Sequence, residues 1–503
     1  MRVTRKTRLR DVSDLFARQR ALVLAVFGAW LVVIARSAVF IAFPQSFFDS
    51  DQAIVGLMAK HLIEGRAFPL FFYGQTYLLG VEAWVAAPFF AIAGPTVAAL
   101  HLTILSFNLA AASLLIVGLV RWGGVTPLQA LVASLFFTLA PPFTAAQLVE
   151  ANGANIGPFL YVPLLWFLRD RPFWFGAVFG IGVLNREFTI YAVPVLLALQ
   201  AAEGSLFRAE RLRMWLIAGA VFLAVWQSVD ALKPYADLMG PGTRGMPVPG
   251  GPGSIVGNVI ARTSVASAEL IERIAAMARE YFPRQIGAVH VESGPLSQGR
   301  DWLLWPVGVA LAGGCLRALL LMWRRRDDRP STAFGWYLVG VGVLSAAGYV
   351  LTRPVGDPID RYMLLTIYGA VGIVAVVLAL EPRAWLRNVM MTLVVGWAAI
   401  SATDHCRLWS HYASGREPDV AQQMADELVA RRIDVAAAGY WRSYKLTFLA
   451  RERVKIASTE VSRITRYDWL AQQQGDRLLT LSAEPCATDQ APVHGWYLCR
   501  RGR

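Results

Sequence analysis

Long apolar runs recur along this chain and constrain its fold more than any other feature. The chain has 503 residues, of which 56% are hydrophobic. A helix needs about 20 apolar residues to cross the hydrocarbon core of a bilayer, and most of the runs reach or approach that length. They lie near residues 21–43, 96–120, 126–143, 155–168, 173–185, 187–202, 212–230, 302–323, 332–351, 362–380 and 385–403. The sequence therefore predicts a polytopic α-helical membrane protein with about 11 transmembrane helices rather than a soluble globular protein.

Positive charge lies between the apolar runs instead of gathering on one face or tail, although the formal net charge is +13. This distribution is typical of the positive-inside rule and does not indicate nucleic-acid binding. If the ambiguous segment 76–93 does not cross the membrane, the basic loops fall on the same side as the basic N-terminus. If it crosses, they fall on the opposite side. We therefore expect residues 51–93 to form external amphipathic helices on the membrane surface, with a cytoplasmic N-terminus and an external C-terminus.

The composition changes after the last long apolar run, where the apolar segments become short. Residues 435–440 and 453–457 are typical of buried strands, and residues 419–432 are typical of a helix. We therefore divide the chain into a transmembrane domain, residues 1–404, and a small C-terminal extracytoplasmic α/β domain, residues 405–503.

Two of the four cysteines, Cys486 and Cys499, lie close together in this C-terminal region. In an oxidising compartment they would form a disulfide across a hairpin, and otherwise they would be two buried thiols. No cysteine and histidine spacing in the sequence is typical of a metal site.

Carboxylates next to the expected membrane spans are the first candidates for chemistry. Asp49 and Asp51 follow the first apolar run, and Glu150 lies in the next external loop. Charged groups near lipid are costly and often functional, and a carboxylate can act as a general base towards an acceptor hydroxyl. Alternatively, the two aspartates only cap a helix that begins near Gln52, and Glu150 is an exposed loop acid. Glu150 could also orient the acceptor or bind a divalent cation together with Asp51.

Basic residues near external span ends are candidates for binding a phosphate. Arg186, followed by Glu187, interrupts an apolar stretch, and Arg361 precedes Tyr362 at another span end. The planar guanidinium binds anionic oxygens in a bidentate manner, which favours a phosphate site. The alternatives are an internal ion pair for Arg186 and a role as interfacial anchor for Tyr362. Further candidates to line the substrate site are Lys60, His61, Tyr73, Gln75 and Glu187.

Residues 51–65, DQAIVGLMAKHLIEG, resemble the acidic first-loop motif of GT-C membrane glycosyltransferases. The resemblance points to bacterial aminoarabinose and glycan-modifying transferases and, more distantly, to protein O-mannosyltransferases. The segments 68–75, 360–364 and 439–448 also contribute to it. The family often has Asp-Glu where this chain has Asp51-Gln52, and Lys-Gly where it has Arg186-Glu187.

This resemblance implies a GT-C fold and an inverting transfer of a sugar from a polyprenyl-phosphate donor. The acceptor would be an envelope glycan, lipid or protein on the outer face of the bacterial inner membrane. By position, Asp51 matches the catalytic acid of the family, Glu150 its second-loop acid, and Arg186 the basic residue that meets the donor phosphate. No cofactor is expected besides the donor lipid, and the use of a divalent cation is left open.

The residues also suit this chemistry by themselves, because a base activates the acceptor and cations stabilise the departing lipid phosphate. A transporter or flippase of lipid-linked sugars is the competing hypothesis, since it would use the same cations without a base. Transporters tend to place charges between helices at the bilayer midplane, whereas the acids of this chain lie at span ends.

Overall fold

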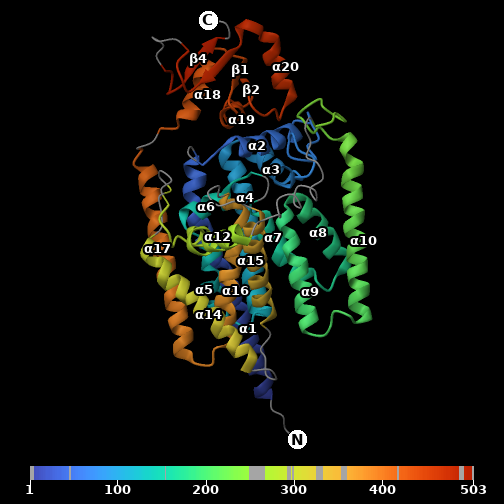
Figure 1. Ribbon diagram of the computed structural model, residues 1–503, viewed down its shortest axis with the longest axis vertical. Coiled ribbons are helices and arrows are strands. Elements are labelled where there is room, and N and C mark those ends of the chain that lie inside the picture. The colour runs from blue at the N-terminus through green and yellow to red at the C-terminus, as the bar shows by residue number, and fades with distance from the viewer. Residues whose placement is uncertain are drawn as a thin grey trace.

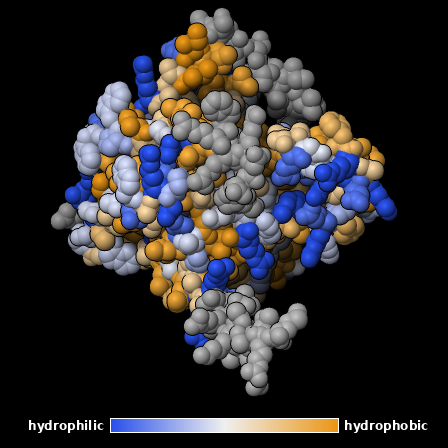
Figure 2. All heavy atoms as spheres, turned by 90° about the horizontal axis from the view of Figure 1, so that it is seen from below, coloured by the Kyte–Doolittle hydropathy of each residue, from blue (hydrophilic) through white to orange (hydrophobic). Residues whose placement is uncertain are grey.

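The computed structural model describes residues 5–44, 47–152, 155–248, 267–291, 296, 300–324, 332–352, 359–415, 418–486 and 492–500. Figure 1 shows a tall helical bundle with a small α/β domain above it, and the two chain termini at opposite ends of the long axis. The loops between α9 and α10 and between α16 and α17 turn at the same lower end as the N-terminal helix (Figure 1). Seen from below, this end carries patches of hydrophilic side chains among apolar ones (Figure 2).

Seven helices in the described part of the chain are long and apolar enough to cross a membrane. The elements that form these spans are α1 (Arg5–Ala42), α4 (Val97–Trp122), α10 (Ala209–Leu232), α14 (Leu304–Arg324), α15 (Ala333–Thr352), α16 (Thr366–Leu380) and α17 (Ala384–Ala413). Shorter helices are α3 (Val81–Ala93), α7 (Gly157–Leu168), α8 (Pro172–Asn185), η2 (Glu187–Tyr191), α9 (Ala192–Ala202), α12 (Ser267–Ala276), the π-helical η4 (Met277–Tyr281), α13 (Phe282–Gln285) and η6 (Asp360–Met363). The predicted polytopic helical fold is confirmed, although several of the predicted runs form helices shorter than a full span.

The predicted run at 126–143 is not one straight helix. It forms α5 (Pro127–Thr138) and α6 (Pro142–Val149), which are bent by 84° at the break between them. Pro141 and Pro142 explain this break, because proline cannot donate a backbone hydrogen bond and disfavours a helical residue before it. The bend turns α6 so that it ends at Glu150.

Side chains from other helices satisfy the carbonyl groups at this break. Irregular backbone at membrane depth is tolerated only where other groups of the protein complete its hydrogen bonds. Fully buried Arg36 donates to the Phe137 carbonyl, and at the far end of α6 Asn108 donates to the Leu148 carbonyl over 2.8 Å. Two residues of α17 also donate to backbone carbonyls. Ser401 donates to the Leu139 carbonyl over 2.8 Å, and His405 donates to the Ala140 carbonyl over 2.9 Å. The break is therefore built into the packing of α1, α4 and α17.

Helix α2 (Ser50–Ile63) lies across the top of the bundle and beneath the C-terminal domain (Figure 1). It packs on α3 and on α19 (Tyr440–Leu449), and its residues from Gln52 to His61 are all buried. The approach to α19 is close, because a Cβ atom at Gly56 would lie 2.5 Å from the Phe448 ring. We predicted an external amphipathic helix on the membrane surface, whereas α2 is buried between the bundle and the C-terminal domain.

The C-terminal α/β domain contains a four-stranded sheet in the order β2-β1-β3-β4. Strand β1 pairs in parallel with β2 and β3, and β4 pairs antiparallel with β3. The elements are α18 (Val420–Ala430), β1 (Val435–Ala438), β2 (Lys455–Ser458), α20 (Thr465–Gln474), β3 (Leu479–Ser482) and β4 (Tyr497–Arg500). The two predicted strands and the predicted helix are thus present. The predicted boundary after residue 404 falls inside α17, and Cys486 forms a disulfide with Cys499.

Candidate functional site

Three predicted acids come together where the start of α2 meets the end of α6. Asp49 caps α2 and accepts a hydrogen bond from the backbone N–H of Gln52 over 2.9 Å. Glu150 follows α6 and accepts from Asn152 and Asn155 over 2.9 and 3.3 Å. The carboxylates of Asp49, Asp51 and Glu150 are close enough to affect one another electrostatically. We expected these acids only at external span ends on one side of the membrane, and the α5–α6 bend places Glu150 next to the two aspartates.

Gln52 joins the two loops that carry these acids. Its side-chain N–H donates to the Phe47 carbonyl over 2.6 Å. Its oxygen accepts from His101 on α4 over 2.9 Å and lies 3.4 Å from the backbone nitrogen of Ala151. A glutamate could not donate to Phe47, so the amide at this position serves the packing of the two loops. The side chain of Gln52 thus points into the protein.

Two of the acids are partly buried, which disfavours their charged forms. Burial raises the pKa of Asp49 to about 6, and the neighbouring Asp51 carboxylate adds to this effect. Burial also raises the pKa of Glu150 to about 8, the Asp49 charge adds to it, and Arg361 opposes it. Such shifts are typical of functional sites, because a group that titrates near neutral pH can exchange protons.

The Asp51 carboxylate has one partner at each oxygen, a cation at one and a hydrogen-bond donor at the other. The Arg361 guanidinium lies 3.8 Å from Oδ2, and the Tyr440 hydroxyl donates to Oδ1 over 2.5 Å. Only 15% of the Asp51 side chain is exposed, so these two contacts define which way the carboxylate points. Asp360, next to Arg361, is paired with Arg284 of α13 at 3.4 Å.

The predicted phosphate-binding residues lie beside the acids. The guanidinium groups of Arg186 and Arg361 lie 5.2 and 5.7 Å from the centre of the Tyr362 ring. Arg186 follows the last residue of α8, Asn185, whose side chain donates to the Leu79 carbonyl over 3.0 Å. Two guanidinium groups near one aromatic ring, one of them facing the Asp51 carboxylate, can bind a phosphate. The structure therefore brings Arg186, Arg361 and Tyr362 together.

Two further predicted residues lie near this arginine pair. Glu187 is exposed at the start of η2, and after burial it is the main cause that raises the pKa of Tyr77. Gln75 lies in the same loop as Tyr77, next to Gly74, whose carbonyl accepts from Arg463 over 3.1 Å. Both residues are thus at the edge of the arginine and acid cluster.

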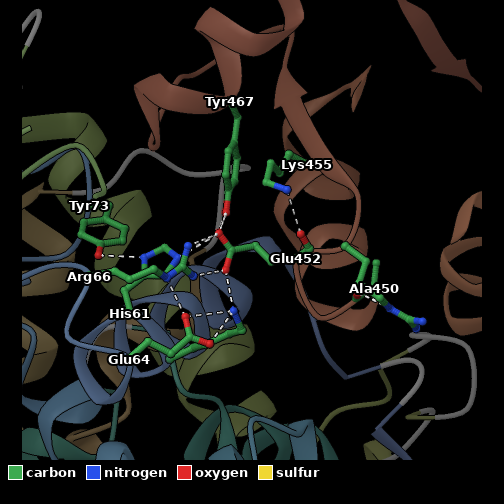
Figure 3. A network of polar contacts seen from close by, with 10 residues as sticks. His61, Glu64, Arg66, Tyr73, Ala450, Glu452, Lys455 and Tyr467 are labelled. Atoms are coloured by element: carbon green, nitrogen blue, oxygen red, sulfur yellow. Dashed lines mark hydrogen bonds and ion pairs between the residues drawn. The ribbon is translucent and has the colours of Figure 1, made fainter. Parts of the chain in front are cut away.

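The other three predicted lining residues belong to a different cluster, around Glu452 at the C-terminal end of α2 (Figure 3). Lys60 lies 2.7 Å and His61 3.2 Å from the Glu452 carboxylate. Tyr73 contacts the other ring nitrogen of His61 over 3.0 Å. Burial lowers the pKa of His61, so a neutral ring that donates to Glu452 and accepts from Tyr73 fits all three contacts.

The sequence analysis did not identify the site residues that the C-terminal domain contributes. Tyr440 is 389 positions from Asp51, and Arg463 lies over its ring at 5.7 Å. Lys445 of the same helix, α19, affects the Asp49 carboxylate electrostatically. The only signal for them was the resemblance of residues 439–448 to the family, which assigned no role to any side chain.

A divalent cation was left open by the sequence. In the described ranges, no group of three or more His, Cys, Asp or Glu side chains is placed to hold a metal ion.

Two crystal structures of ArnT from Cupriavidus metallidurans are similar to this chain. The structure of ArnT bound to undecaprenyl phosphate superimposes with a TM-score of 0.53 and 12% identity, covering 91% of this chain and 92% of that chain. The apo structure gives a TM-score of 0.52 at 12% identity and covers 90% of this chain and 92% of that one. No protein-family model and no curated protein matches the sequence. Because the likeness extends over nearly the whole of both chains, this chain has an ArnT-like fold.

Proposed function

We propose that this protein is an inverting glycosyltransferase that moves a sugar from a polyprenyl-phosphate donor to an envelope glycan, lipid or protein. The reaction would take place on the extracytoplasmic face of the bacterial inner membrane. The observation that carries this proposal is the cluster of three carboxylates and two guanidinium groups under the C-terminal domain. The ArnT-like fold supports it, since one ArnT structure is bound to undecaprenyl phosphate.

Asp51 is the proposed general base. Its carboxylate takes the proton of the acceptor hydroxyl while that oxygen forms a bond to the anomeric carbon of the sugar. The bond between the anomeric carbon and the phosphate oxygen breaks at the same time, and its electron pair leaves with the lipid phosphate. A single displacement of this kind inverts the anomeric centre.

Arg186 and Arg361 are the proposed partners of the departing phosphate. Their positions on the Tyr362 ring are set before the negative charge develops, which is the condition for strong electrostatic stabilisation of a transition state. Arg361 also faces Asp51 at 3.8 Å, so one cation connects the proposed base with the proposed phosphate site. This arrangement keeps the reacting groups of donor and acceptor close together.

Glu150 and Asp49 take supporting roles in this proposal. With a pKa of about 8, Glu150 is largely protonated at neutral pH and can donate a hydrogen bond to the acceptor. Asp49, with a pKa of about 6, is mostly ionised there and caps α2 next to the base. The raised pKa values limit the negative charge of the cluster, which favours the approach of an anionic donor.

Sugar transfer in isolated membranes tests the proposal. Membranes with wild type, Asp51→Asn or Arg186→Ala receive a radiolabelled polyprenyl-phosphate sugar, and label in endogenous envelope acceptors is counted. We expect both variants to lose transfer, by about 10²- to 10⁴-fold for the loss of the base. Asp170→Asn is the matched control, because that acid pairs with Arg211 in an exposed ion pair outside the cluster. Unchanged transfer in Asp51→Asn would overturn the proposal and favour a transporter of lipid-linked sugars.

A further inference from the structure

The contact between Tyr440 and Asp51 links the C-terminal domain to the proposed chemistry. We propose that Tyr440 is a positioning residue that fixes the direction of the Asp51 carboxylate, so that the active site is complete only with the C-terminal domain seated on α2. This inference rests on the proposed function, and it gives the C-terminal domain a part in the reaction.

The starts of α2 and α19 are joined at Ser50. The Ser50 hydroxyl donates to the Tyr440 carbonyl over 2.6 Å and accepts from the backbone N–H of Lys445 over 3.2 Å. Ser50 is fully buried and directly precedes Asp51 in α2. The backbone of Tyr440 is therefore fixed relative to the backbone that carries the proposed base.

The ring of Tyr440 is held as firmly as its backbone. Only 7% of the residue is exposed, and Trp441 and Tyr444 pack on the ring with centroids 5.2 and 5.7 Å away. Arg463 lies over the same ring, and its guanidinium is anchored by the Gly74 carbonyl at 3.1 Å. Packing on several sides restricts the orientation of the ring. In this orientation the Tyr440 hydroxyl lies 2.5 Å from Asp51 Oδ1.

A donor at this place suits a positioning role better than a role as proton donor. Burial, reinforced by the Asp51 charge, raises the pKa of Tyr440 well above its usual value, so the hydroxyl keeps its proton. It thus donates a permanent hydrogen bond to one carboxylate oxygen, while Arg361 faces the other. A general base must lie within hydrogen-bond reach of the hydroxyl that it deprotonates, and a small misplacement can cost about 100-fold in rate.

Tyr440→Phe tests the inference, because it removes the hydroxyl and keeps the ring. We expect kcat to fall by about 10- to 100-fold, with KM for the polyprenyl-phosphate sugar unchanged. The acid limb of the pH–rate profile should also move to higher pH. The hydrogen bond stabilises the ionised carboxylate, so its loss makes protonation of the base easier. A purely structural role of Tyr440 would not move this limb.

Thr447→Val is the matched control, because it removes another buried hydroxyl from α19. That hydroxyl donates to the Ser443 carbonyl over 2.9 Å and accepts from the backbone N–H of Ile456 over 3.0 Å, so kcat and the pH profile should stay as in wild type. A wild-type kcat and pH profile in Tyr440→Phe would overturn the inference, as would equal losses in both variants without a shift of the acid limb. In the same assay, an active Asp51→Asn would instead overturn the proposed function itself.

Discussion

The two ends of helix α2 carry buried polar clusters of opposite character. At its start, three carboxylates lie near one another, and burial raises the pKa of Asp49 to about 6 and that of Glu150 to about 8. At its other end, the buried carboxylate of Glu452 is surrounded by Lys60, His61, Arg66 and Tyr467. Burial alone would raise the pKa of Glu452, but these hydrogen bonds and charges outweigh it and lower the pKa far below the usual range.

This difference in pKa shift suits a structural role for Glu452 and the proposed chemical roles for the acids at the start of α2. The contacts of Glu452 with Lys60, His61 and Arg66 join α2 and the loop after it to the C-terminal domain, so the cluster acts as a clamp between them. Asp49 and Glu150, in the cluster at the start of α2, have fewer donors and titrate nearer to neutral pH. Buried charge that is fully paired is typical of structure, whereas buried charge with shifted pKa values is typical of reactive sites.

The largest effect is expected at Asp51. Asp51→Asn keeps the size of the side chain but removes the proposed base, so transfer should fall by about 10²- to 10⁴-fold. The unfolding temperature of the purified protein in detergent should hardly change, since the amide can still contact Tyr440. If Asp51→Asn unfolds at a much lower temperature than wild type, Asp51 would instead stabilise the fold, as Glu452 does.

Glu452→Ala should do the opposite and act mainly on stability. It leaves Lys60 and Arg66 without their buried partner, which costs about 3–5 kcal/mol when one member of a buried ion pair is removed. We expect faster proteolysis of the C-terminal domain and a lower unfolding temperature. As a control, Glu427→Ala removes a more exposed pair with Arg431 in the same domain and should cost about 0.3–0.5 kcal/mol. If Glu452→Ala and Glu427→Ala are equally stable, the Glu452 cluster does not clamp α2 to the C-terminal domain.

A smaller and pH-dependent effect is expected at Glu150. Its pKa rises from 4.5 to about 8 on folding, so wild type loses stability as the pH rises through this window. The loss is at most about 1.4 kcal/mol per pH unit, and solvent reduces it because Glu150 is half-buried. Glu150→Gln should therefore unfold at a higher temperature than wild type above pH 8, and at a similar one near pH 4.5.

Glu452 should show the reverse pH dependence, which gives a control with the opposite sign. Its pKa is lowered on folding, so its contribution is present above 4.5 and is lost as the pH falls below that value. Thermal unfolding of wild type, Glu150→Gln and Glu452→Gln across this range checks both signs. Parallel curves for the three proteins would show that the two clusters do not differ in the way described.

The smallest effect is expected at Gln52. Gln52→Glu restores the Asp-Glu pair that the family often has, but it removes the N–H that satisfies the Phe47 carbonyl. Leaving a buried acceptor without its donor costs about 1–3 kcal/mol, and the new carboxylate adds negative charge beside Asp51. We expect a modest fall in unfolding temperature and in transfer. Higher transfer in this variant would show that a second acid at this position takes part in the reaction.

The helical fold could be predicted from the sequence because apolar length is a local property. The strands near 435 and 455 and the helix near 420 were also visible as short patterns. The break at Pro141 and Pro142 was missed, since the apolar run continues through both prolines. Only the packing shows that Arg36, Ser401 and His405 complete the hydrogen bonds of the broken helix.

The candidate site could be predicted in part. The positions of Asp49, Asp51 and Glu150 at span ends brought them to attention, and the structure places them together. Lys60 and His61 lie near Asp51 in sequence, yet two helical turns carry them to the other end of α2 and to Glu452. Tyr440 could not be assigned a role, because no local pattern indicates which distant carboxylate a tyrosine will meet.

The sequence by itself determined that this chain forms many membrane-length helices and a small terminal sheet. The reason is local, since backbone groups in an apolar environment must be paired within helices, and alternating short segments favour strands. Only the tertiary structure decided which carboxylate is surrounded by cations and which carboxylates have a raised pKa. Contacts in these clusters join residues as far apart as Asp51 and Tyr440, and they depend on how the C-terminal domain packs on α2.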